Sequence, residues 1–531
     1  MPWSPLRDEK KDMNTVDHSV SDSIYQRVLL APLGLNRENS SVLWILLLFA
    51  SMMGAGLYYF DGNVALVTGI LYLIFVLLLS LFRIDYSLYL FIFTVLLFDQ
   101  FAIPGFESVT HDVSFFLNLK EISYVPFFHA GMISPFEIHI LFITFALILH
   151  IAIRRDYDLK PIPVWGSFLL FFACLALAFL NGMRTGGDFL VALWEVRALF
   201  YFCLVYLIVP QILDSKKQIT QLVWVIIIGV TIKSIQGVVR FAELGFTTGG
   251  FAVLTNHEDP VFLVTLFVML TGFLLYQTGQ KQKLWLLVCL LILFLGFYVA
   301  QRRATYASLI VSVMAVMIIL PALKRIQFLK YLLPVLSILL VYGFLFWNDD
   351  SSAVGRPVQM VKSGFVEPDK ETNFADYSSN LYRSNENYNL AQTVVNNTVL
   401  GTGFGKRYDQ PIPLIDIRFT LRDYIPHNQI YWVLVKMGAI GFFAFWFFFN
   451  CFVARGVQVF NRLDDPYLKV ITMVIVIAVI NQMVVSFYDL QLTYYRSMIY
   501  LGGLMGLLPV ILHIDREQKS REVSNNGRSH E

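Results

Sequence analysis

The chain has 531 residues, of which 57% are hydrophobic and 15% charged, and its formal net charge is +2 at pH 7. Soluble domains carry about 25% charged residues, so this composition excludes an ordinary soluble protein and indicates an integral membrane protein. The small net charge, with no basic run beside aromatic residues, argues against nucleic-acid binding. All four cysteines fall within apolar stretches, which indicates packing roles and neither disulfides nor metal ligands: Cys174, Cys203, Cys289 and Cys451.

The first predicted element, residues 1–41, is polar and of mixed charge, and we expect a cytoplasmic N-terminal tail. Apolar stretches of roughly 20 residues then recur, which is the length a helix needs to cross ~30 Å of hydrocarbon. Helices are expected because an open sheet leaves backbone groups unsatisfied in lipid. The fold class predicted is therefore all-α, a polytopic transmembrane helical bundle of about fourteen spans: Val42–Phe60, Val64–Phe82, Ser87–Phe101, Ser134–Ile153, Trp165–Asn181, Phe189–Ile212, Leu222–Arg240, Val261–Tyr276, Leu284–Ala300, Ala304–Leu323, Leu332–Trp347, Ile430–Val453, Leu468–Phe487 and Tyr495–Leu512.

One long polar interval divides these spans. Eleven spans are predicted in residues 42–347, a long periplasmic loop with short helices in 348–428, and three further spans in 429–513. Residues 514–531 are charged and polar, and they are predicted to form a cytoplasmic C-terminal tail. The loop contains clustered acids and amides and ends where the next apolar stretch begins, so we expect it to contribute the active site.

The positive charges of the connections predict an orientation. Alternate connections are rich in lysine and arginine, as in Arg154 with Arg155, Lys216 with Lys217, and Lys281 with Lys283. The positive-inside rule assigns these connections to the cytoplasm, so both termini are predicted to be cytoplasmic and the long loop to lie on the opposite side. An even number of spans agrees with this orientation.

Several cations fall on the predicted external side, against that bias. Arg302 and Arg303 occupy an external turn, and Arg240 ends a span on the same side. Arginine binds phosphate oxygens in a bidentate way, so this accumulation predicts a site for a diphosphate. The alternative is that these arginines extend to the membrane interface without a ligand.

Two more sets of charged residues are predicted to need partners inside the bundle. Lys233 shares a helix face with Gln236 and Arg240 but lies roughly 10 Å deeper, where a cation usually faces a cavity or a partner. Glu195 and Arg197 are two residues apart and therefore do not face each other on a helix, so each is expected to have its own partner.

His427 ends the long loop at the predicted membrane boundary. A neutral imidazole can accept a proton from a hydroxyl group near neutral pH, which makes His427 a candidate general base. The alternative is a structural histidine beside Asn428, which is a typical helix-capping residue.

Three groups of residues resemble the O-antigen ligase and Wzy-type O-antigen polymerase superfamily of bacterial membrane proteins. The first is Pro426–Tyr431 followed by Val435–Gly441, a His-Asn pair that opens a span ahead of a Gly-x-x-Gly. The second is Arg383 with Leu390–Leu400 and the turn Gly401–Gly405, which includes Gly403. The third is Arg303–Tyr306 on the external side.

The resemblance implies a GT-C-like, metal-independent glycosyltransferase of the inner membrane with no cofactor. Its donor would be an undecaprenyl-diphosphate-linked oligosaccharide, and its acceptor another glycan or lipid A-core. By the same resemblance, His427 would be the catalytic base, and Arg303, Arg302 and Arg240 would bind the diphosphate. Arg383, Asn428 and Gly403 would belong to the substrate and acceptor loop, and proteins of polysaccharide export or chain-length control would be partners.

Two alternatives remain open at this point. The motifs do not separate a polymerase of O-antigen or exopolysaccharide from a ligase that completes lipopolysaccharide. A flippase for lipid-linked oligosaccharides would also have many spans and intramembrane cations, but it predicts internal repeats, and none is evident in the sequence.

Overall fold

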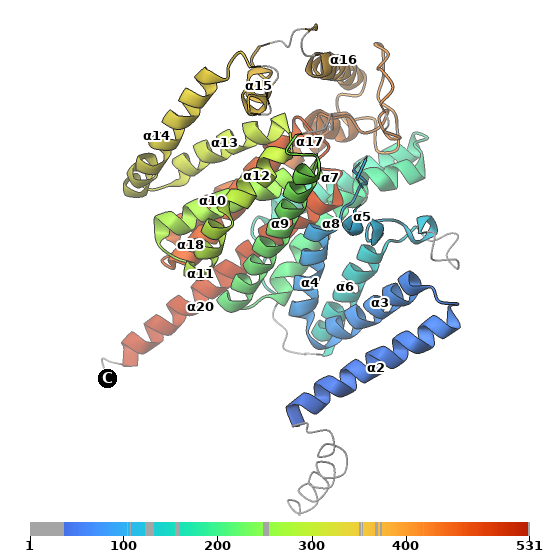
Figure 1. The fold of residues 1–531 in the computed structure, drawn as a ribbon, viewed down its shortest axis with the longest axis vertical. Coiled ribbons are helices and arrows are strands. Elements are labelled where there is room, and N and C mark those ends of the chain that lie inside the picture. The colour runs from blue at the N-terminus through green and yellow to red at the C-terminus, as the bar shows by residue number, and fades with distance from the viewer. Residues whose placement is uncertain are drawn as a thin grey trace, which may run out of the picture. The chain divides into compact units, whose positions relative to one another are not determined.

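The computed structural model describes residues 37–103, 105–106, 108–122, 132–153, 159–247, 254–349, 352, 354–366, 370–371, 374–417 and 419–528. Most of the predicted N-terminal tail therefore lies outside the described residues. The described chain contains helices and turns and no strand (Figure 1). The helices are α2 Arg37–Tyr59, α3 Val64–Phe82, α4 Ile84–Leu97, α5 Val109–Asp112, η3 Leu119–Glu121, α6 Pro135–Ile153, α7 Trp165–Arg184, α8 Phe189–Ile212, α9 Lys216–Glu243, α10 Asp259–Tyr276, α11 Gln280–Val288, α12 Leu290–Val299, α13 Arg303–Ile319, α14 Ala322–Leu345, α15 Arg356–Lys362, α16 Phe374–Asn396, α17 Gln429–Arg462, α18 Pro466–Ser486, α19 Tyr495–Met505 and α20 Leu507–Arg528.

The all-helical, polytopic class predicted from the sequence is confirmed. Ten helices of the described chain are long and apolar enough to cross a membrane, or up to eleven if α11 and α12, bent by 57°, form one broken span. The other predicted spans correspond to shorter apolar helices within α2, α4 and α13. The helix α20 continues to Arg528, so much of the predicted C-terminal tail is helical.

The chain divides into two compact units, residues 1–76 with 122–130 and residues 77–121 with 131–531. In the first unit α2 and α3 approach each other at Gly56, where an added Cβ atom would lie 2.8 Å from Val67 Cγ1. In the second unit α8 packs on α19, and α18 contacts α10, α13 and α17, while α9 packs between α4 and α12 (Figure 1).

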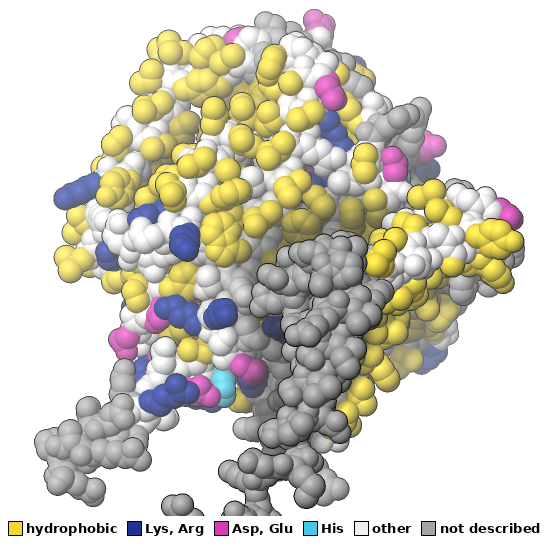
Figure 2. All heavy atoms as spheres, turned by 60° about the horizontal axis from the view of Figure 1, so that its bottom comes forward, with side chains coloured by type: hydrophobic (Ala, Val, Ile, Leu, Met, Phe, Trp, Pro, Cys, Tyr) yellow, Lys and Arg dark blue, Asp and Glu magenta, His cyan; other side chains and the backbone are white. Residues whose placement is uncertain are grey.

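The most exposed side chains of the second unit include large apolar ones on α14. Leu323, Ile338 and Phe344 are 83%, 68% and 85% exposed. Figure 2 shows hydrophobic side chains over broad areas of one face of the molecule. Such surfaces are unfavourable in water and suit contact with lipid acyl chains.

A glycine turn fixes the connection between α16 and α17. Gly403 has φ +80°, and a Cβ atom added there would lie 2.2 Å from the backbone nitrogen of Gly182 at the end of α7. Gly438 has φ +63° and interrupts α17, and the freed carbonyl groups accept hydrogen bonds from the turn. The N–H of Thr402 donates to Val435 O at 2.8 Å, and that of Gly403 donates to Lys436 O at 3.0 Å.

A buried ion pair fixes the same turn. Lys436 Nζ lies 2.8 Å from Glu195 Oε1, and both side chains are fully buried. Glu195 Oε2 also accepts the backbone N–H of Gly405 at 2.5 Å. Arg197 instead pairs with Glu137 at 2.7 Å, so Glu195 and Arg197 do have separate partners. These contacts hold α8, α17 and the glycine turn together.

Candidate active site

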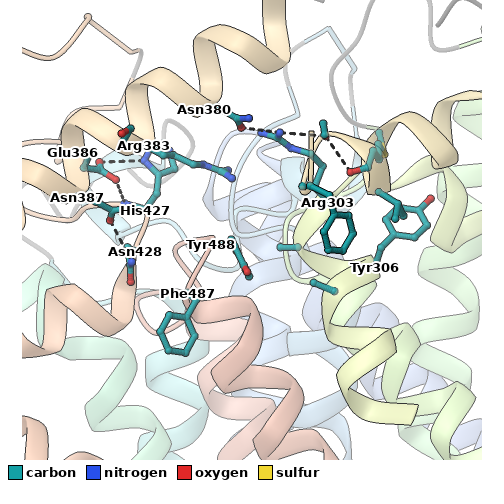
Figure 3. Close-up of a pocket in the computed structure, with 18 of the residues that line it drawn as sticks. Arg303, Tyr306, Asn380, Arg383, Glu386, Asn387, His427, Asn428, Phe487 and Tyr488 are labelled. Carbon is teal, nitrogen blue, oxygen red and sulfur yellow. Dashed lines mark hydrogen bonds and ion pairs between the residues drawn. The ribbon is translucent and has the colours of Figure 1, made fainter. Parts of the chain in front are cut away.

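A cavity of about 600 Å³ lies between α13, α15, α16, the start of α17 and the end of α18. Figure 3 shows His427 and Asn428 at one end, Arg303 at the other, and Arg383 between them. Phe487 and Tyr488 line the side opposite α16. The cavity therefore combines charged groups with aromatic and apolar walls, as ligand sites generally do.

His427 is held by Glu386 of α16. The backbone N–H of His427 donates to Glu386 Oε2 at 2.9 Å, and its Nδ1 lies 3.2 Å from Glu386 Oε1. A carboxylate only accepts hydrogen bonds, so this contact places the proton on Nδ1 and leaves a lone pair on Nε2. The Glu386 side chain is 1% exposed, whereas that of His427 is 23% exposed and borders the cavity.

Asn428 has the capping role expected of it. Its side-chain oxygen accepts the N–H of Tyr431 at 3.1 Å, which satisfies one of the free donors at the start of α17. Its amide nitrogen donates to Asn387 of α16 at 3.2 Å. The two contacts fix the residue next to His427 to both helices.

Arg303 begins α13 and has only neutral partners among the described residues. Its guanidinium donates to Asn380 Oδ1 at 2.8 Å, to Ser379 Oγ at 3.1 Å and to Ser363 Oγ at 3.4 Å. No described carboxylate neutralises its charge, so the cation remains available to an anion in the cavity.

Arg383 supplies a second cation to the same cavity. It makes no hydrogen bond or ion pair with another described residue, although it lines the cavity beside His427 and Arg303. Burial lowers the pKa of the Arg383 guanidinium, Asp489 opposes this effect, and the positive charges of Arg303 and Arg302 add to it. Two neighbouring cations that form no ion pair with a described carboxylate favour the binding of a multiply charged anion.

Arg302 does not line this cavity, and its guanidinium contacts His257 instead. Its guanidinium donates to Nε2 of His257, whose Nδ1 lies 2.9 Å from Asp489 Oδ2. Burial and the positive charge of Arg302 lower the pKa of His257, which favours the neutral ring. Burial alone would raise the pKa of Asp489, but His257, Arg302 and Arg383 lower it strongly.

Arg240 does not line the cavity either. Its guanidinium donates to Leu254 O at 2.9 Å and lies 5.5 Å from the centre of the Phe106 ring. Lys233, on the same face of α9, forms a buried ion pair with Asp99 and donates to Gln236 at 2.7 Å. The cation predicted to need a partner inside the bundle therefore has one.

The structure brings together His427, Asn428, Arg303 and Arg383 of the predicted site residues, whereas Arg302, Arg240 and Gly403 lie outside the cavity lining. Sequence reasoning did not identify Glu386, Asn380, Phe487 or Tyr488. Glu386 lies three residues after Arg383, on neighbouring positions of one helix, and this spacing was the available signal. No group of three potential metal-ligating residues occurs within the described part of the chain.

A family model described as O-antigen ligase matches residues 287–446. The matched segment contains Arg303, all of α16, the glycine turn and His427, and it confirms the family resemblance of these motifs. It supports a function of the O-antigen ligase or polymerase type, which is a glycosyl-transferring activity on lipid-linked glycans. No curated protein sequence matches the chain.

Proposed function

We propose that this multi-pass membrane protein, with its O-antigen ligase match over residues 287–446, transfers a glycan from an undecaprenyl-diphosphate donor to an acceptor sugar. The acceptor is a second lipid-linked repeat in a polymerase and lipid A-core in a ligase. One observation carries the proposal: His427 and the cations Arg303 and Arg383 line a single cavity.

In the proposed reaction the acceptor hydroxyl gives its proton to His427 Nε2 as its oxygen attacks the anomeric carbon of the donor sugar. The bond between that carbon and the diphosphate oxygen breaks, and undecaprenyl diphosphate leaves with the electron pair. Arg303 and Arg383 stabilise the charge that develops on the leaving group. Glu386 keeps the imidazole in the tautomer that can accept the proton.

The donor's isoprenoid tail would remain in the hydrocarbon while its diphosphate enters the cavity. We assign the cavity to the periplasmic side of the inner membrane, with both termini cytoplasmic, on the charge distribution of the connecting loops. The diphosphate role is assigned to Arg303 together with Arg383, because Arg302 and Arg240 are engaged elsewhere.

The test is glycan transfer by purified His427→Ala with an undecaprenyl-diphosphate-linked oligosaccharide as donor. We expect transfer to fall by about 10²–10⁴-fold, which is the usual contribution of a general base, while donor binding is retained. His513→Ala is the matched control, because His513 lies on α20 and pairs with Glu517 outside the cavity. Transfer at the wild-type rate by His427→Ala would contradict the proposal.

A further inference from the structure

A second cavity of about 330 Å³ adjoins the first and has a different character. The two cavities share lining residues, among them Ser363, Phe365, Asn380 and Ser384. The eight described residues that line the second cavity include no charged side chain. Cations therefore border the first cavity and neutral groups border the second.

Two neighbouring faces of α16 produce this difference. Tyr377, Asn380, Leu381 and Ser384 line the second cavity and recur at i, i+3, i+4 and i+7, so they share one helix face. Arg383, Glu386 and Asn387 lie on the adjacent face and line the first cavity. Asn380 and Ser384 stand at the edge between the two faces and border both cavities.

The face of α16 that lines the second cavity carries polar groups whose hydrogen-bonding capacity is not used within the described part of the chain. A guanidinium only donates, so Asn380 must turn Oδ1 to Arg303, and its Nδ2 makes no hydrogen bond to a described residue. The hydroxyl groups of Tyr377 and Ser384 also have no hydrogen-bond partner among the described residues. Together these groups offer donors and acceptors to a ligand rich in hydroxyl groups.

Aromatic surface accompanies these polar groups. Phe365, in the connection between α15 and α16, is 83% exposed and lines both cavities. Tyr377, from α16, adds a second ring to the lining of the second cavity. An exposed phenylalanine in a polar connection is unfavourable in water, and its flat face suits the apolar face of a sugar ring.

We propose that the second cavity is a binding subsite for an uncharged sugar residue of the glycan carried by the donor. This inference rests on the proposed function and adds a division of the substrate between the two cavities. Arg303 and Arg383 bind the diphosphate in the first cavity. In the second cavity the sugar contacts Tyr377, Ser384 and Phe365. Asn380 lies between the two and borders both. The subsite selects the glycan, while the first cavity binds any polyprenyl diphosphate.

The test measures binding of two probes to the full-length protein in lipid nanodiscs. One probe is undecaprenyl diphosphate without sugar, and the other is the undecaprenyl-diphosphate-linked oligosaccharide extracted from cells that make this protein. We expect Tyr377→Ala and Tyr377→Phe each to weaken binding of the glycan-bearing probe by roughly 3–10-fold, as the loss of one or two neutral contacts predicts, because Tyr377 lines the second cavity and not the first. Binding of undecaprenyl diphosphate should not change.

Two control variants complete the design. Tyr388→Ala removes a tyrosine that is 48% exposed on the same helix and lines neither cavity, so binding of both probes should match that of the wild type. Arg303→Ala should weaken binding of both probes.

Equal binding of the glycan-bearing probe by wild type, Tyr377→Ala and Tyr377→Phe would overturn the sugar subsite and leave the proposed function standing. Loss of both probes by these two variants would also overturn it, because their effect would then not be specific to the glycan. If neither probe binds the wild type, the proposed function itself fails.

Discussion

His427 acts in the proposed site only through the position and tautomer that Glu386 gives it. Glu386 is buried on α16 and contacts both the backbone N–H and Nδ1 of His427. A neutral amide at position 386 can still accept from the backbone, but it loses the charge that stabilises an imidazolium ring. We therefore expect Glu386→Gln to lower the turnover number for glycan transfer by roughly 10–100-fold with little change in donor affinity.

A double variant separates this role from a general structural one. If Glu386 acts through the imidazole, adding Glu386→Gln to His427→Ala should cause no further loss of transfer, because residues that act as a unit are not additive. Additive losses in the double variant would assign Glu386 an independent role.

A second carboxyl group gives the molecule a pH-dependent stability. Glu258 is fully buried, and burial raises its pKa from 4.5 to about 7, against the opposing charge of Arg496. The folded state therefore binds a proton that the unfolded state releases, so the contribution of Glu258 to stability is greatest below pH 4.5 and is lost as the pH rises towards 7.

Glu258→Gln cannot titrate, so its thermal unfolding midpoint in detergent should rise relative to the wild type between pH 5 and pH 8. The difference is at most about 3.5 kcal/mol, from ~1.4 kcal/mol for each unit of the pKa shift from 4.5 to about 7. Glu243→Gln is the matched control, because it makes the same substitution at an exposed position near the end of α9. A constant difference for Glu258→Gln would contradict the argument.

At the scale of elements, the glycine turn decides whether α7, α16 and α17 meet. Gly403 and Gly186 have nearly the same φ, +80° and +84°, but different surroundings. A Cβ atom at Gly403 would lie 2.2 Å from the Gly182 nitrogen, whereas a Cβ atom at Gly186 would meet no atom within 4 Å. The pair therefore separates backbone strain from steric overlap.

Gly186→Ala should cost about 1–2 kcal/mol, the strain of placing a residue with a side chain in the left-handed region. Gly403→Ala adds overpacking of about 1–3 kcal/mol, and it should lower the unfolding midpoint further and reduce the yield of folded protein. The measurement is thermal unfolding of both variants in the same detergent. Equal midpoints for the two variants would show that the turn can move away from α7.

At the scale of the whole molecule, the length of each apolar run was enough to predict the helices. A helix in lipid must satisfy its own backbone hydrogen bonds, so its extent is largely a local property. The break between α11 and α12 could not be predicted from the sequence. It lies at Cys289, inside an apolar run that contains neither proline nor glycine at that point.

The site was only partly predictable for a related reason. Motif residues such as His427 and Arg303 could be identified one at a time, but their partners depend on which faces of distant helices meet. Glu386 lies 41 residues before His427 in the sequence, and Asn380 lies 77 residues after Arg303. The same dependence directs Arg302 towards His257 although its neighbour Arg303 borders the cavity.

The orientation in the membrane gives the last prediction, because the proposed reaction requires α16 to face the compartment opposite to both termini. The native cysteines suit a labelling test: Cys174, Cys203 and Cys289 are buried and Cys451 is half-buried, so background reaction with a membrane-impermeant maleimide should be low. In spheroplasts we expect Tyr388→Cys on α16 to react at once. Lys281→Cys and Ser520→Cys, at exposed positions on α11 and α20, should react only after permeabilisation. Reaction of Lys281→Cys before permeabilisation, with Tyr388→Cys protected, would place His427 on the cytoplasmic side and remove the basis for transfer at the periplasmic face.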